Sequence, residues 1–175
     1  MPAEIIGLPP VAVAPPPRAG LGAGSEPSEH GDARVWAWHH AGLVVPHLDE
    51  SIAFYRGTLG FEVEFLVRGM DDQFQRTVAI PDVSCDLAQL VAPFSGTRLE
   101  LIQVFNLPDG VPATHPVHVG VGHGAYQVRD LDASLAALVA DGGRAMGEIV
   151  DFEEGRAVYC FTPVGTVVEL EEAWI

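Results

Sequence analysis

The chain has 175 residues, of which 48% are hydrophobic, enough for the core of one domain or of two small halves. Its formal net charge of −15 argues against nucleic-acid binding through a basic surface, and the absence of lysine excludes Schiff-base and P-loop mechanisms. The two cysteines lack CxxC spacing, no apolar run reaches the roughly 20 residues of a membrane span, and the N-terminus lacks a basic signal region, so we expect a cytoplasmic protein without disulfides.

The first segment of the chain differs in composition from the rest. Residues 1–33 are rich in Pro, Ala and Gly and show no period of 2 or 3.6. They are predicted to form a flexible N-terminal arm, or alternatively a strap that becomes ordered along a neighbouring subunit.

Residues 34–105 are predicted to form a first module. VWAWHHAGLVV predicts a strand, and LDESIAFYRGTLGF predicts a helix with Asp49 as N-cap and Gly60 at its end. Four further segments separated by turn signals predict strands: 61–67, 77–83, 85–92 and 98–105.

Residues 106–119 predict a linker loop, and residues 120–175 a second module of similar order. GHGAYQV predicts a strand and DLDASLAALVADGG a helix that ends at paired glycines. AVYCFT and VVELEEAW predict the closing strands.

The two modules show an internal repeat. When His40 is placed on His123, HAGLVVPHLDESIAFYRGTLG aligns without gaps with HGAYQVRDLDASLAALVADGG, and identities fall in the strand, the helix start and the helix stop. Each half also ends in an apolar strand interrupted by one acidic residue, Glu100 or Glu169. We therefore predict a duplicated unit with a pseudo-two-fold axis.

The opening strand and the turn after it hold three histidines, His39, His40 and His47, and only His40 has a histidine at the repeat-related position. Side chains alternate between the two faces of a strand, so His39 and His40 are expected on opposite faces. The apolar residues that follow at alternate positions are expected to face the helix, which places His40 and His123 on the concave face.

Pseudosymmetry would then bring two imidazoles and two carboxylates together: His40, Glu100, His123 and Glu169. A buried unpaired carboxylate costs several kcal/mol, and a divalent cation removes that cost. This donor set suits one divalent ion, Ni, Co, Zn, Mn or Fe. The alternative is that each glutamate pairs with an arginine such as Arg98 or Arg156, without a metal.

The segments HHAGLVVPHLDESIAFYRGTLGF, RLELIQ, GHGAYQVRDLD and TPVGTVVELEE resemble the vicinal-oxygen-chelate superfamily over residues 36–173. The superfamily includes glyoxalase I, methylmalonyl-CoA epimerase, extradiol dioxygenases and fosfomycin- and bleomycin-resistance proteins. The resemblance implies an α+β fold in which paired βαβββ modules form a cupped mixed sheet, with the metal in the cup. It also implies association as a homodimer.

The resemblance places His40, Glu100, His123 and Glu169 on the ligand positions, a set similar to that of bacterial glyoxalase I. The epimerase often has Gln where Glu100 stands, and extradiol dioxygenases leave that position unused. The usual Asp-Pro-Asp-Gly-Asn turn reads Thr-Pro-Val-Gly-Thr here, and no glutathione-binding pattern is found, so the small-molecule substrate stays open.

The first hypothesis for function is a metal-dependent isomerase, epimerase or lyase that moves a proton next to a carbonyl of a substrate chelated through vicinal oxygens. Glu169 or Glu100 would act as the catalytic base, and three arginines are candidates for holding an anionic substrate group: Arg68, Arg76 and Arg98. An Fe(II)-dependent dioxygenase of the extradiol type is the first alternative. A small-molecule binding or resistance protein is the second.

Overall fold

The structure is a computed structural model in which residues 34–174 are described, so the predicted arm at residues 1–33 lies outside the described residues. The strands of this region form one mixed sheet of nine strands in the order β2-β3-β4-β1-β5-β9-β8-β6, with β7 paired to β8. The strands are β1 (Val35–Val44), β2 (Glu62–Met70), β3 (Ser84–Val91), β4 (Arg98–Phe105), β5 (Gly122–Val128), β6 (Arg144–Ala145), β7 (Val150–Asp151), β8 (Gly155–Phe161) and β9 (Val167–Ala173).

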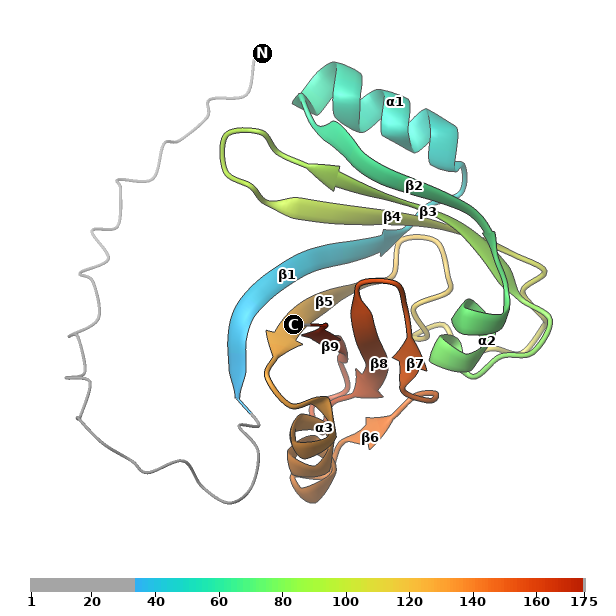
Figure 1. Cartoon of the computed structure of the whole chain (residues 1–175). Coiled ribbons are helices and arrows are strands. Elements are labelled where there is room, and N and C mark those ends of the chain that lie inside the picture. The colour runs from blue at the N-terminus through green and yellow to red at the C-terminus, as the bar shows by residue number, and fades with distance from the viewer. Residues whose placement is uncertain (1–33, 175) are drawn as a thin grey trace, which may run out of the picture.

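The two halves of the sheet are arranged alike. β1 and β5 pair antiparallel at the centre, β4 runs parallel to β1, and β9 runs parallel to β5. The sheet curls so that its two halves face each other, with the helices α1 (Leu48–Leu59) and α3 (Leu131–Ala140) on its outer face (Figure 1). The predicted α+β fold with a cupped mixed sheet is confirmed.

Alternate residues of each strand supply the two faces of the curled sheet. On the outer face, α1 packs on Leu90 and Leu101, and α3 packs on Val158 and Leu170. Burying side chains of this size stabilises a fold by about 1.5–3 kcal/mol each. The outer face therefore supplies two of the three cores of the described region.

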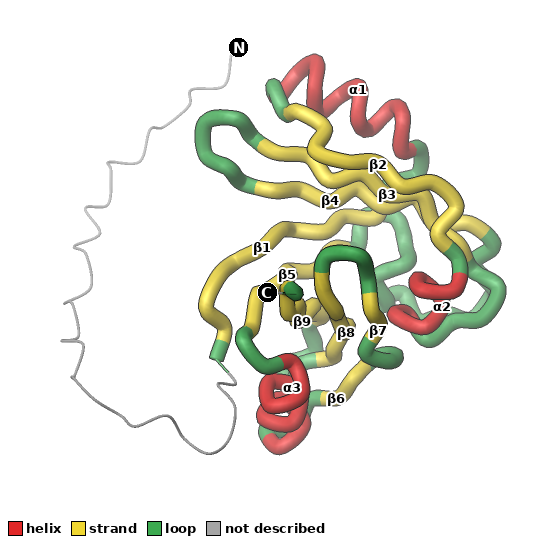
Figure 2. The backbone as a smooth tube through the Cα atoms, in the orientation of Figure 1, coloured by secondary structure: helices red, strands yellow, loops and turns green. Residues whose placement is uncertain are grey.

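The third core fills one end of the concave face and joins the two halves. It brings Phe74 and Val78 of α2 (Asp72–Val78) against Ile102 of the first half and Tyr159 of the second. Figure 2 shows α2 between the two halves of the sheet, on the inner side. This packing closes one end of the cup. The rest of the concave face is left for polar residues.

The strand predicted at residues 77–83 is wrong, because α2 ends at Val78 and a turn follows it. The apolar residues Val78, Ile80 and Val83 suggest a strand, yet Phe74 and Val78 are four residues apart and bury one face of a helix. β2 also continues to Met70, beyond the predicted end at residue 67, and the two-residue strands β6 and β7 were not predicted.

The N-cap predicted at Asp49 is also wrong: α1 begins after His47, whose side chain makes no capping hydrogen bond. Asp130, which aligns with His47 in the repeat, does cap α3 by accepting a hydrogen bond from the backbone N–H of Ala133 at 2.9 Å. Asp49 lies in the first turn of α1 and pairs with Arg68.

The cap of α3 leads to a stability prediction. Asp130→Ala should lower the free energy of unfolding by about 1 kcal/mol, because an N-terminal N–H of α3 loses its acceptor. His47→Ala, at the matching position of α1, should change it by less, since its side chain makes no capping hydrogen bond. Urea denaturation of the two variants tests this, and equal losses would contradict it.

Among the described residues, no helix combines the length and hydrophobicity needed to cross a bilayer.

Candidate functional site

The backbone register brings together the two predicted histidines and the two predicted glutamates. On the antiparallel pair β1 and β5, His123 lies opposite Gly42, and Glu100 on β4 is in register with the same glycine. The relation repeats in the other half, because His40 and Glu169 share a register partner on β5, an alanine. One chain thus places all four side chains at the pseudo-two-fold axis.

The Nε2 atoms of the two histidines lie close to each other and to one carboxylate oxygen of each glutamate. The Nε2 atoms of His40 and His123 are 3.3 Å apart. The Oε2 atom of Glu169 lies 3.4 Å from the first and 3.2 Å from the second. The Oε2 atom of Glu100 lies 3.6 and 4.0 Å from the same nitrogens. Two donors on one ion at about 2.0–2.2 Å can be no more than about 4.4 Å apart, so all these separations suit a shared cation.

The two histidines are buried, with side chains only 3% (His40) and 1% (His123) exposed. Burial lowers the pKa of His123. Burial also acts to lower the pKa of His40, but its contacts with Glu100, Glu169 and Glu171 outweigh burial and raise it. Two nitrogens that face each other at 3.3 Å need a proton or a cation between them.

The two glutamates differ in their environment. Burial acts to raise the pKa of Glu100, but its close contact and charge interaction with His40 outweigh burial and lower it. The pKa of Glu169 is raised well above its usual range by burial and by the charge of Glu171. Its Oε2 atom is buried and has no hydrogen-bond partner among the described residues. The excess of carboxylates and this unpartnered oxygen fit a divalent cation.

Gly42 makes room for the imidazole of His123. A Cβ atom at Gly42 would lie 1.9 Å from Cε1 and 2.4 Å from Nε2 of that ring, closer than atoms can approach. The ring therefore occupies the space that a side chain would fill. Because Gly42 is itself buried, the ring cannot keep this position if the glycine is replaced.

Gly42→Ala should therefore displace the ring of His123 and weaken divalent-metal binding by about 10-fold or more, as expected when a ligand is misplaced. Isothermal titration with Zn(II) measures this. Gly57→Ala is the matched control: nothing lies within 4 Å of a Cβ there, and it should leave zinc binding unchanged while stabilising α1 by about 0.5–1 kcal/mol. Equal zinc affinity in both variants would contradict the role of Gly42.

The prediction that His39 and His40 face opposite sides is wrong. The register of β1 against β5 shifts between Trp38 and His40, as at a β-bulge, and a bulge can place consecutive side chains on one side. The Nδ1 atoms of His39 and His40 lie 2.9 Å apart, and Nδ1 of His39 lies 2.7 Å from Glu171. His39 thus reaches the edge of the site.

Two residues that contact the predicted ligands were not predicted. Glu171 lies two residues after Glu169 and so on the same strand face, a signal visible in the sequence. Tyr159, in register with Glu169, places its hydroxyl 3.3 Å from Nε2 of His123. Burial and the neighbouring carboxylates raise the pKa of Tyr159 well above its usual range, so its hydroxyl stays protonated.

The alternative in which arginines neutralise the two glutamates is not supported. Arg98 donates two hydrogen bonds to Glu64, at 2.9 Å each, and Arg156 pairs with Glu172. The other arginine candidates for substrate binding are paired with carboxylates too: Arg68 with Asp49 and Asp86, and Arg76 with Glu148.

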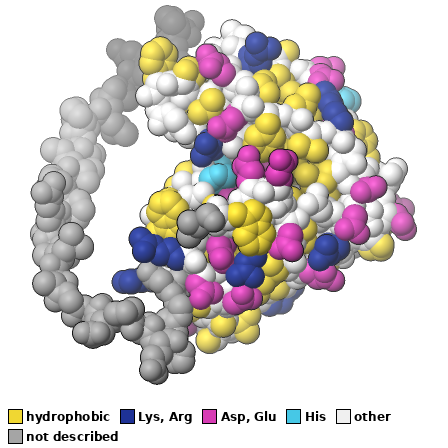
Figure 3. All heavy atoms as spheres, viewed as in Figure 1, with side chains coloured by type: hydrophobic (Ala, Val, Ile, Leu, Met, Phe, Trp, Pro, Cys, Tyr) yellow, Lys and Arg dark blue, Asp and Glu magenta, His cyan; other side chains and the backbone are white. Residues whose placement is uncertain are grey.

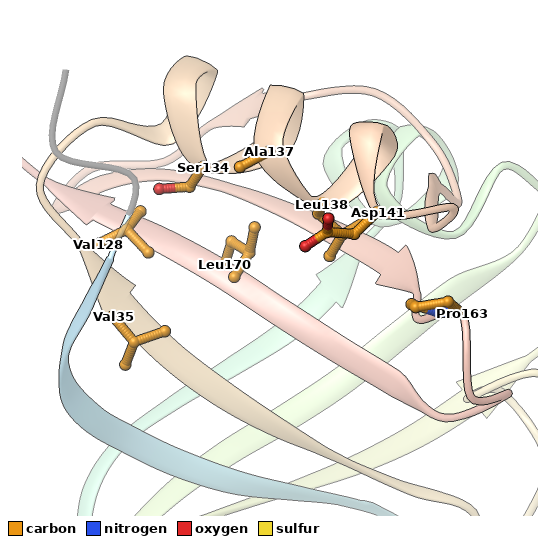
Figure 4. Close-up of a pocket in the computed structure, with 8 residues that line it drawn as sticks. All are labelled: Val35, Val128, Ser134, Ala137, Leu138, Asp141, Pro163 and Leu170. Carbon is orange, nitrogen blue, oxygen red and sulfur yellow. The ribbon is translucent and has the colours of Figure 1, made fainter. Parts of the chain in front are cut away.

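The described surface includes one hollow beside the site and another on the outer face of the sheet. One, of about 610 Å³, is lined by Thr114, His123 and Thr166 and by glycines of β5, and it borders the site. The other, of about 320 Å³, lies between α3 and the outer face of the sheet, where Leu138 and Leu170 line it (Figure 4). It opens on the face opposite the histidines and is separate from the site. Figure 3 shows a histidine in a hollow between the two halves of the molecule.

Solved structures are similar to this chain in fold. Methylmalonyl-CoA epimerase from Mycobacterium tuberculosis is 24% identical, with a TM-score of 0.57 over 81% of this chain and 90% of that chain. A variant of the Streptomyces coelicolor methylmalonyl-CoA epimerase, in complex with 2-nitronate-propionyl-CoA, is 20% identical, with a TM-score of 0.53 over 81% and 100%. 2,2',3-Trihydroxybiphenyl 1,2-dioxygenase from Sphingomonas wittichii strain RW1 is 16% identical, with a TM-score of 0.50 over 78% and 42%.

At these identities the likenesses show the fold alone, and no curated protein matches the sequence significantly. The sequence itself matches a protein-family model over residues 37–170. This range is most of the chain and includes both halves of the sheet. The chain belongs to the glyoxalase/bleomycin resistance protein/dioxygenase superfamily.

Proposed function

We propose that the protein is a divalent-metal-dependent isomerase, epimerase or lyase that moves a proton next to a carbonyl of a small molecule. The observation that carries this proposal is the convergence of His40, Glu100, His123 and Glu169 at the pseudo-two-fold axis, with the buried Oε2 atom of Glu169 left without a hydrogen-bond partner. A divalent ion held there would polarise a carbonyl and stabilise the negative charge that develops on its oxygen.

The two glutamates are assigned different roles. Glu100 lies beside His40 and is assigned as an anionic ligand. Glu169, whose buried Oε2 atom lies beside both histidines and has no hydrogen-bond partner among the described residues, is assigned as the general base. Glu169 would take the proton from the carbon next to the carbonyl and return it to the neighbouring atom, whereas inversion at that carbon would need a second acid to deliver a proton to the opposite face. His40 and His123 would stay in place as ligands.

The number of protein ligands supports proton transfer over oxygen insertion. As long as both glutamates stay bound, four ligands leave at most two positions on an octahedral ion. Two positions suffice for a substrate that chelates through two adjacent oxygens, and none is left for O₂. The proposed reaction is accordingly redox-neutral and needs no oxidant.

One observation favours a second candidate, an Fe(II)-dependent dioxygenase. His40, His123 and Glu169 lie within 3.4 Å of one another, whereas Glu100 is 3.6 and 4.0 Å from the histidines. Two histidines and one carboxylate are the ligand set of many non-heme Fe(II) oxygenases. If Glu100 were not a ligand, a third position would be open.

The two candidates are separated by the requirement for oxygen. The protein is loaded in turn with Zn(II), Co(II), Ni(II), Mn(II) and Fe(II) and incubated in D₂O, without oxygen, with methylmalonyl-CoA and with a set of small α-hydroxy ketones. Proton NMR should show metal-dependent deuterium uptake at the carbon next to the carbonyl of at least one compound. Turnover of catechols seen only with Fe(II) and oxygen, without such uptake, would overturn the proposal in favour of the second candidate.

A further inference from the structure

The Nδ1 side of the His40 imidazole contacts two residues, His39 and Glu171, that have no role in the proposed reaction. Its Nε2 atom faces His123, whereas its Nδ1 atom lies 3.4 Å from Oε1 of Glu171 and 2.9 Å from Nδ1 of His39. Nδ1 of His39 in turn lies 2.7 Å from Oε2 of Glu171. One carboxylate thus faces two adjacent ring nitrogens, one with each of its oxygens.

This arrangement is confined to one half of the molecule. The register of β4 and β9 makes Ile102 the counterpart of Glu171, just as Glu100 is the counterpart of Glu169. Ile102 is buried in the apolar core, and Nδ1 of His123 is buried with no hydrogen-bond partner among the described residues. The ring of His123 instead occupies the space above Gly42 and packs against the ring of Tyr159.

The protonation state of Nδ1 decides what Nε2 can do. A neutral imidazole carries a proton on one nitrogen and a lone pair on the other, and the hydrogen bond made by one nitrogen selects which. An ionised carboxylate only accepts hydrogen bonds. With Glu171 as acceptor, Nδ1 of His40 carries the proton and Nε2 presents its lone pair to the centre of the site.

We infer that Glu171 is a positioning residue, which accepts the Nδ1 proton of His40, is held in place by His39, and prepares Nε2 of His40 to bind a metal ion. This inference rests on the metal site of the proposed function. Carboxylates that accept from the second nitrogen of a metal-binding histidine orient the ring, and their loss typically costs 10–100-fold in metal affinity.

The same contacts allow two other arrangements, which the test must separate. The Nδ1 proton of His39 could be donated to Nδ1 of His40, which would put a proton on Nε2 of His40 and turn it away from metal binding. Alternatively, His39, His40 and Glu171 could hold a second ion, since one donor atom of each lies within 4.8 Å of the others.

The experiment compares Glu171→Ile, which installs the residue of the other half, with Glu171→Gln, whose amide oxygen can still accept. Zinc affinity is measured by titration, and the ring of His40 is observed by proton and nitrogen-15 NMR of the zinc-loaded protein. Glu171→Ile should weaken zinc binding 10–100-fold and abolish the protected Nδ1–H signal of His40. Glu171→Gln should keep the signal and lose less affinity.

Glu50→Gln on the exposed face of α1 is the control for the loss of one negative charge, and should leave both measurements unchanged. If wild-type protein binds zinc and Glu171→Ile binds it equally well with the same signal, the positioning role is overturned while the metal site stands. A second equivalent of zinc that disappears in His39→Ala would also overturn it. If the wild type binds no zinc at all, the proposed function itself fails.

Discussion

His40→Ala is expected to remove nearly all divalent metal from the purified protein. The imidazole of His40 is 3% exposed, and its Nε2 atom is within 3.6 Å of donor atoms of His123, Glu100 and Glu169. Losing a direct ligand should weaken binding by at least about 100-fold, the upper end of what loss of an outer-shell partner costs. Elemental analysis of protein purified without chelators measures the bound metal.

His47→Ala is the matched control, because His47 is exposed and its side chain makes no capping hydrogen bond. It should retain the full metal content. His39→Ala is expected to keep the ion at reduced affinity, since His39 reaches the site through Glu171. The ligand assignment would be refuted by equal metal content in His40→Ala and His47→Ala.

Glu169→Gln is expected to have the largest effect on turnover. An amide can still lie beside the ion but cannot accept a proton from carbon, so kcat should fall by about 10²–10⁴-fold in the metal-loaded enzyme. The assay is deuterium uptake by the substrate identified in the anaerobic experiment, with kcat corrected for the zinc content of each preparation.

Glu100→Gln provides the comparison, because it makes the same change at the pseudosymmetric position. It should weaken metal binding and lower kcat by less than Glu169→Gln, since Glu100 is assigned as a ligand and not as the base. A larger fall in kcat for Glu100→Gln than for Glu169→Gln would exchange the roles of the two glutamates.

The sequence by itself determined the duplicated architecture and the meeting of its polar strand residues. The ungapped repeat carries the strand, the helix start and the helix stop, and two equivalent copies tend to associate through a pseudo-two-fold axis. Strand alternation then assigns His40, Glu100, His123 and Glu169 to one face. In the structure these four side chains do meet within one chain. Such features are readable because they depend on local periodicity and on symmetry.

The tertiary structure decided where local periodicity breaks. The register shift before His40 lets His39 reach Glu171, although strict alternation would separate the two histidines. Residues 72–78 form a helix because Phe74 and Val78 fill the concave end between the two halves. That space is formed by strands from both halves, so it cannot be predicted from the local sequence.

Contacts between strands that are distant in the chain could also not be predicted from the sequence. The hydroxyl of Tyr159 reaches His123, and the ring of His123 needs the space above Gly42, through strand pairings between β1, β5, β9 and β8. The asymmetry between Glu171 and Ile102 is visible in the sequence when Glu100 is aligned with Glu169. Only the curled sheet shows that Glu171 lies against Nδ1 of His40, because that contact joins strands of opposite halves of the molecule.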